Sequence, residues 1–134
     1  MKDPNLQASR WLKQAEHDLV VSQTLLRNSF YSDGCFMSEQ MAKKAVKAFL
    51  FAKGERVVAE QSLKELMMRA QGYDQSFESL LDAAGILDQH YLSTRYPDAL
   101  AFPGIPYEIY TEQQAGEAVQ LATSIINLVR SKVG

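Results

Sequence analysis

The chain has 134 residues and a formal net charge of −2 at pH 7, with a pI near 5.7. This length is typical of one domain that buries a sufficient core without a metal or a disulfide, so we expect residues 1–134 to form a single domain. The weak negative charge excludes a nonspecific coat for DNA or RNA, which needs a strong positive field, and leaves room only for a local basic pocket.

The sequence offers little sign of export or membrane insertion. The single Cys35 cannot form an internal disulfide, and we expect it to be a buried apolar side chain. No apolar run approaches the roughly 20 residues of a membrane span, and the first residues lack the apolar core of a signal peptide. We therefore expect a cytoplasmic protein that has no membrane partner.

The first half of the chain predicts two long amphipathic helices. Apolar residues recur at spacings of three and four over residues 4–27, where Pro4 suits the first turn, and again over residues 32–53, where Gly54 suits the C-terminal cap. The second helix carries two apolar stripes, which predict contacts on two sides, as in a central helix or in one shared with a dimer partner. The stripes are Ser38, Met41, Ala45, Ala48 and Ala52, and Phe36, Val46, Phe49 and Leu50.

The second half predicts a short helix followed by a longer one. Ser62 and Glu65 have the spacing of a capping box, and Gly72 is expected to end the short helix. Asp74 is a suitable N-cap for the next helix, which we expect to continue until Pro97. The apolar face of this helix comprises Phe77, Leu80, Leu81, Ala84, Leu87 and Tyr91.

Residues 99–110 are apolar and aromatic, but two prolines and a glycine argue against a helix. We expect this segment to lie over the domain with Phe102, Ile105 and Ile109 buried. A second capping box, starting at Thr111, begins the last helix. No strand-like alternation occurs, so the predicted fold is all-α: an up-and-down antiparallel helical bundle of four long helices plus one short helix.

Two polar patterns suggest a binding function. In the first, Arg95 either complements a helix C-terminus and pairs with Asp98, or binds phosphate through its planar guanidinium, with Tyr91 and Tyr96 stacking on a base. In the second pattern, polar residues share one face of the second predicted helix, which is either solvated or phosphate-binding. These residues are Gln40, Lys44 and Lys47, bordered by Lys43.

Together, these patterns resemble the HEPN domain family over nearly the whole chain. Residues 91–98 match the Tyr-x-x-x-Arg-Tyr-Pro-Asp motif that is characteristic of HEPN proteins of this kind. Similar proteins often carry Gln-x-x-Glu-Lys-x-x-Lys, and here Gln40, Lys44 and Lys47 are present while Lys43 replaces the acid, which makes this face more basic. The resemblance implies a small helical protein associated with nucleotides, nucleotidyltransferases or RNA cleavage.

The histidines argue against catalysis. HEPN ribonucleases resemble one another in an Arg-x(4–6)-His motif, in which the histidine transfers protons and the arginine steadies the phosphate. No histidine follows Arg95 in that window, His90 precedes it, and we expect His17 to lie on the surface. Neither a zinc constellation nor a Gly-rich phosphate loop occurs. We therefore expect no catalytic residue, no metal and no cofactor.

The leading hypothesis is a non-catalytic HEPN protein that binds a nucleotide or a nucleic-acid phosphate. The resemblance also implies a role as partner subunit of a separately encoded minimal nucleotidyltransferase. The alternatives are a HEPN ribonuclease toxin of a toxin–antitoxin pair and a purely structural dimerisation module, and the two stripes of the second helix lead us to expect a homodimer. The candidate binding residues are Gln40, Lys44, Lys47, Tyr91, Arg95, Tyr96 and Asp98.

Overall fold

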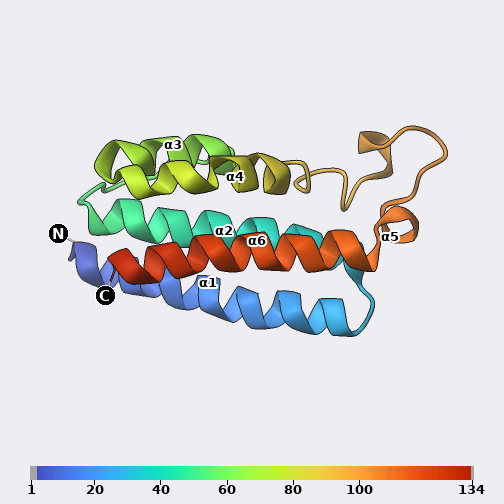
Figure 1. Ribbon diagram of the computed structural model, residues 1–134, viewed down its shortest axis with the longest axis horizontal. Coiled ribbons are helices and arrows are strands. Elements are labelled where there is room, and N and C mark those ends of the chain that lie inside the picture. The colour runs from blue at the N-terminus through green and yellow to red at the C-terminus, as the bar shows by residue number, and fades with distance from the viewer. Residues whose placement is uncertain (1–2, 134) are drawn as a thin grey trace.

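The computed structural model describes residues 3–133, and their regular secondary structure is helical throughout, without a strand. Three long helices, α1 (Pro4–Arg27), α2 (Tyr31–Ala52) and α6 (Glu112–Lys132), run side by side (Figure 1). The shorter α3 (Leu63–Tyr73) and α4 (Leu81–Asp88) form a second layer that covers part of α2. The predicted all-α helical bundle is confirmed.

Helix α2 is the centre of the core and packs against α1, α3 and α6. Most of both predicted stripes is buried, and only Phe36 and Ala52 are partly exposed: Met41, Ala45 and Ala48 have no exposed surface, and neither do Phe49 and Leu50. Because helices of the same chain cover both stripes, they no longer give a reason to expect a dimer. The homodimer stays a prediction, but a surface other than these stripes would have to form its interface.

The caps that begin and end the helices form as the sequence predicts. Ser62 accepts a hydrogen bond from the backbone N–H of Glu65, and Thr111 does the same for Gln114, each within a complete capping box. Gly54 follows α2 with a φ of +96°, in the left-handed region that glycine adopts without strain. The predicted boundaries of the long helices are accurate to within about one residue.

The predicted fourth helix is shorter than expected and is divided. Asp74 caps a helical segment as predicted, and its carboxylate accepts from the backbone N–H of Ser76 at 2.9 Å. The segment begins as a 3-10 helix, Gln75–Leu80, and continues as α4, which ends at Asp88 and not at Pro97.

Residues 89–95 form turns, in which the backbone N–H groups of Gln89, His90 and Tyr91 donate to the carbonyl oxygens three residues earlier, at 3.2, 2.9 and 3.3 Å. Ser93, Thr94 and Arg95 each donate from the side chain to the carbonyl oxygen four residues earlier, at 2.7, 2.7 and 2.6 Å. Such local hydrogen bonds compete with helix formation. The apolar pattern of residues 77–91 contains no sign of this competition, so it overestimated the length of the helix.

Residues 97–109, here called the arm, lie beyond the helix ends, at the end of the bundle opposite the chain termini (Figure 1). The expected burial of the arm is wrong: Phe102 is 98% exposed, Ile109 47% and Ile105 38%. The arm also contains a 3-10 turn (Pro97–Ala99) and the one-turn helix α5 (Pro106–Ile109), since proline is tolerated in a first turn.

None of the described helices is both long and apolar enough to cross a membrane.

Candidate functional site

Arg95 lies among aromatic rings in the turns that follow α4. Its guanidinium carbon is 4.0 Å from the ring centroid of Phe36, 4.9 Å from that of Tyr96 and 5.1 Å from that of Tyr91. Its Nε and Nη2 donate to the backbone carbonyl of Tyr91 at 3.1 and 2.6 Å. We call these four residues the Arg95 cluster. The predicted ion pair with Asp98 does not form, and within residues 3–133 no other carboxylate pairs with Arg95.

Two lysines of α2 lie next to this cluster: Lys43 contacts Tyr91, and Lys47 is linked to Lys43 by a shared carboxylate. The Nζ of Lys43 lies 4.3 Å from the centroid of the Tyr91 ring. Glu60, from the loop between α2 and α3, bridges Lys43 at 3.1 Å and Lys47 at 2.8 Å through its two carboxylate oxygens. The two lysines are only 5% and 9% exposed. The solvated alternative for this face is therefore wrong for Lys43 and Lys47.

A fully buried carboxylate, Glu39, lies behind Lys43. Its Oε2 is 3.0 Å from the Lys43 Nζ, and its Oε1 accepts from the side chain of Gln40 at 2.6 Å. Burial raises the pKa of Glu39, although Lys43 and Gln40 act in the opposite direction. Burial alone would lower the pKa of Lys43, but Glu39 and Glu60 together raise it. Lys43 is thus a charged group with two acidic partners.

These carboxylates correct the interpretation that Lys43 makes the face more basic. The sequence analysis missed both acids, although Glu39 precedes Lys43 by four residues, a spacing that predicts an ion pair on a helix. Glu60 gave no comparable signal, because a loop brings it back over α2.

Lys44 belongs to a different side of α2. Its Nζ is 2.5 Å from Asp18 of α1, which also accepts from the side chain of Gln14 at 3.1 Å. Asp18 and Glu16 have separate partners, since Glu16 pairs with Arg130 at 2.8 Å.

The predicted site residues therefore separate into two groups. The structure brings Tyr91, Arg95 and Tyr96 together and connects Lys47 to them through Glu60 and Lys43. The other candidates lie apart from the cluster: Lys44 pairs with Asp18, Gln40 with Glu39, and Asp98 is exposed in the 3-10 turn.

A hollow of about 260 Å³ lies beside Tyr91 and is lined by Lys43, Glu60 and Asp88, with Gln61 and Ser62. Both carboxylate oxygens of Asp88 already accept hydrogen bonds. Their donors are the backbone N–H groups of Leu63 and Lys64 at the start of α3, at 2.7 and 2.9 Å. Glu60 is the movable acid: its side chain is 63% exposed. The Glu60 carboxylate therefore occupies the side of the two lysines that faces the hollow.

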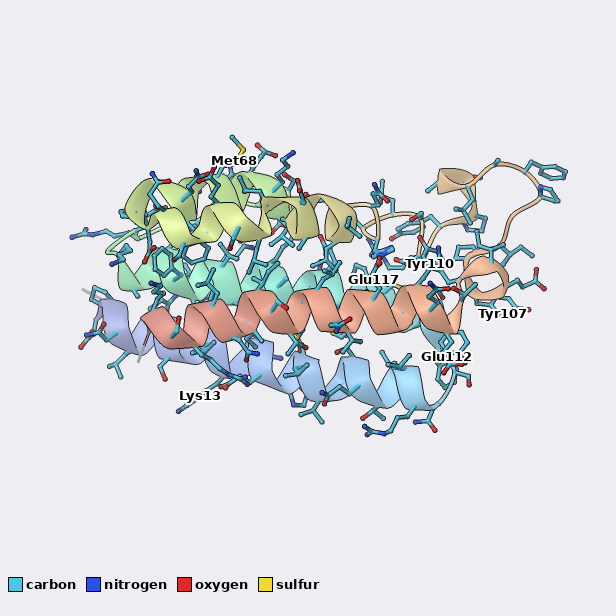
Figure 2. All side chains as sticks on the ribbon, viewed as in Figure 1. Lys13, Met68, Tyr107, Tyr110, Glu112 and Glu117 are labelled. Carbon is cyan, nitrogen blue, oxygen red and sulfur yellow. The ribbon has the colours of Figure 1, made fainter. Side chains whose placement is uncertain are left out.

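His90 lies next to the cluster but inside the protein. It is 8% exposed, and its Nδ1 has no hydrogen-bond partner among the described residues. Burial lowers its pKa, and the charge of Glu117 acts in the opposite direction. Its ring lies edge-on to Tyr110, 5.6 Å between centroids, and Figure 2 shows Tyr110 and Glu117 at the same end of the bundle. His17 is exposed, as predicted.

The same region contains Cys35, which is fully buried as expected. Burial, reinforced by the charge of Glu117, raises the pKa of its thiol to about 12, so this cysteine is a neutral core side chain at ordinary pH. Within residues 3–133, no three His, Cys, Asp or Glu side chains come together as a metal site.

Comparisons with known proteins agree on one family. The HEPN domain family model matches residues 8–132. A putative toxin of Methanocaldococcus jannaschii, MJ1304, is 30% identical over 131 residues, which cover 92% of this chain and 86% of that protein.

Two solved structures resemble the fold closely. TT1696 from Thermus thermophilus superposes with a TM-score of 0.88 at 36% identity, covering 94% of this chain and 98% of that one. ST0689, described as an archaeal HEPN homologue, superposes with a TM-score of 0.78 at 34% identity over the full length of both chains. The chain belongs to the HEPN domain family.

Proposed function

We propose that this protein is a non-catalytic HEPN protein that binds the phosphate of a nucleotide or a nucleic acid at the Arg95 cluster. The observation that carries the proposal is the setting of Arg95, whose guanidinium is stacked on rings without an acidic partner among the described residues. Tyr91 and Tyr96 are 40% and 51% exposed beside it, so a base has rings on which to stack.

The absence of catalysis is part of the proposal. A general base must reach the proton that it removes. His90, which is buried and has a pKa lowered by that burial, has no catalytic role in this proposal.

Calorimetric titration of the protein with ATP, GTP and a short single-stranded RNA tests the proposal. We expect at least one of these ligands to bind, with an affinity that falls as salt rises, because phosphate contacts are electrostatic. A protein that binds none of them at low salt would contradict the proposal and leave Arg95 with a structural role only.

A ribonuclease toxin is the second candidate, because the relative from M. jannaschii bears the name of a putative toxin. The discriminating experiment is incubation with single-stranded RNA and with tRNA, followed by gel analysis. Cleavage that survives repurification and disappears in Arg95→Ala would favour the toxin over the non-catalytic protein.

The arm is the surface that best suits a protein partner. It presents Phe102, Tyr107 and Ile109, which are 98%, 73% and 47% exposed, and such a group of apolar side chains is typical of an interaction site. We extend the proposal to a homodimer, or to a minimal nucleotidyltransferase as partner, through this arm. Light scattering of the pure protein, with Phe102→Ser as the comparison, tests the homodimer.

Replacing Glu60 by glutamine is expected to strengthen phosphate or nucleotide binding by up to about fivefold, since an amide competes less well for the lysines. Its hydrogen bond with Lys47, opposed in part by burial, lowers the pKa of Glu60, so the carboxylate competes at every pH above that lowered value. Stability should also fall, because Lys43 and Lys47 are largely buried and the amide neutralises their charges less well than the carboxylate does.

Titration of inorganic phosphate and ATP into both proteins measures the effect of the Glu60 substitution. The matched control is Glu78→Gln, which removes the same charge from an exposed position outside the site. Equal affinities in the two variants would mean that Glu60 only anchors its loop.

A further inference from the structure

A second aromatic side chain lies along the same face of α2, one helical turn beyond Lys43. Trp11 of α1 is half-buried, and its ring lies 5.7 Å from that of Phe51, between centroids. The Nζ of Lys47 is 5.3 Å from the centroid of the Trp11 ring. Lys43 stands in the same relation to Tyr91, at 4.3 Å. Lys43 and Lys47 therefore each have an aromatic ring of their own.

The spacing of these pairs follows from the geometry of the helix. Phe36, Lys43 and Lys47 are separated by seven and four residues, which keeps them on one face of α2, and one turn advances by about 5.4 Å. Along this face the order is Arg95 with its rings, then Lys43, then Lys47 with Trp11. Alternating cations and aromatic rings are the arrangement by which proteins follow a single nucleic-acid strand.

The side chains around Trp11 form a hollow of their own. It has a volume of about 420 Å³ and is lined by Gln7, Arg10, Trp11, Gln14 and Lys44. This volume lies within the range of small-ligand pockets, roughly 300–1,000 Å³. Glutamine and arginine side chains supply the donors and acceptors that recognise the edges of an unpaired base, while an indole ring supplies the stacking surface.

We infer that Trp11 is the stacking residue of a second base subsite, so that the ligand is a single-stranded oligonucleotide rather than a free mononucleotide. This inference rests on the proposed phosphate site at Arg95. One base stacks at the Arg95 cluster, the connecting backbone passes Lys43 and Lys47 after Glu60 has moved aside, and a later base enters the Trp11 hollow. Arg10, which is exposed on α1, and Lys44 border the hollow.

The chain contains one tryptophan, so its fluorescence reports on this hollow alone. The experiment titrates the protein with uridine mono-, di-, tetra- and hexanucleotides and follows tryptophan emission, corrected for ligand absorption, together with calorimetry. We expect no emission change with the mononucleotide. We expect quenching by the longer strands, with an affinity gain of roughly fivefold or more when the second base is engaged.

Two variants with the same change of charge locate the effect. Arg10→Ala alters the hollow, whereas Lys13→Ala removes a cation from the same helix but not from the hollow. Arg10→Ala should reduce the advantage of long strands over the mononucleotide, and Lys13→Ala should leave it unchanged. Trp11→Leu should abolish that advantage, and because it also removes packing against Phe51, its thermal melt is recorded alongside.

The outcomes separate this inference from the proposed function. Binding that depends on Arg95 but shows neither length dependence nor quenching would overturn the Trp11 subsite and leave the phosphate site standing. Equal effects of Arg10→Ala and Lys13→Ala would overturn it as well. If no strand of any length binds, both the subsite and the proposed function fail.

Discussion

Replacing Lys43 by methionine is expected to destabilise the folded protein by about 3–5 kcal/mol at neutral pH. The substitution keeps most of the apolar stem but removes the ammonium group 3.0 Å from the buried Glu39. Glu39 has no exposed surface, so its carboxylate would have to remain charged without its partner or take up a proton. Either change raises the free energy of the folded state and leaves that of the unfolded chain unaffected, because Glu39 is solvated there.

The loss should depend on pH in a defined direction. The pKa of Glu39 is raised in the folded protein by burial, and without Lys43 it should rise further. A carboxyl group with a raised pKa binds its proton more tightly when folded. The penalty is therefore absent below the unfolded pKa, near 4.3, and grows as pH rises through the folded pKa. Urea unfolding of Lys43→Met between pH 4 and pH 8 should show the deficit shrinking on acidification.

Two controls identify the buried charge as the cause. The double variant Glu39→Gln with Lys43→Met should recover much of the loss, because no carboxylate remains to be neutralised. Lys47→Met should cost no more than about 1 kcal/mol, since its partner Glu60 is largely exposed and is solvated when released. A deficit in Lys43→Met that does not vary with pH would contradict this account of the core.

Replacing Arg95 by alanine is expected to weaken nucleotide or oligonucleotide binding by roughly 10- to 150-fold, the equivalent of about 1.5–3 kcal/mol for a charge-assisted hydrogen bond. Arg95→Lys keeps the charge but loses the planar fork and its stacking, so binding should still fall, although by less. Calorimetry of both variants with the ligand that the wild-type protein binds best provides the measurement. Arg27→Ala, at an exposed site on α1, is the control with the same change of charge.

Thermal melts alone do not decide the role of Arg95. Its guanidinium packs on Phe36 and donates to the carbonyl of Tyr91, so Arg95→Ala should lose about 1 kcal/mol of stability whether or not a ligand binds. The structural and functional interpretations of Arg95 thus share a stability effect and differ only in affinity. Unchanged affinity in Arg95→Ala would remove the proposed site.

The parts of the fold that local chemistry determines were predictable from the sequence. Apolar spacing located α1, α2 and α6, and the capping boxes at Ser62 and Thr111 located two helix starts. The end of α4 at Asp88 was not predictable, because the apolar spacing continues to Tyr91 while the backbone N–H groups of residues 89–91 donate three residues back instead of four.

The candidate site was predictable only in part, for a related reason. The motif of residues 91–98 indicated Tyr91, Arg95 and Tyr96, which the fold does bring together. Which charge neutralises which lysine depends on tertiary contacts, and Glu60 reaches Lys47 across thirteen residues from a loop without periodicity. The prediction that the arm is buried was wrong because it relied on composition alone. The arm is apolar, but it lies beyond the helix ends, and this position leaves Phe102 in solvent.

The side-chain hydrogen bonds of residues 89–95 also bear on how affinity arises. A segment of turns, whose backbone hydrogen bonds do not form a continuous helical ladder, opens at a lower free-energy cost than the core helices. When this segment opens, the rings and the guanidinium that form the Arg95 cluster separate, so an open molecule has no site. The measured dissociation constant then equals the intrinsic one divided by the fraction of closed molecules. A ligand bound to the cluster therefore also stabilises the closed segment, and amide hydrogen exchange throughout residues 89–95 should slow when it binds.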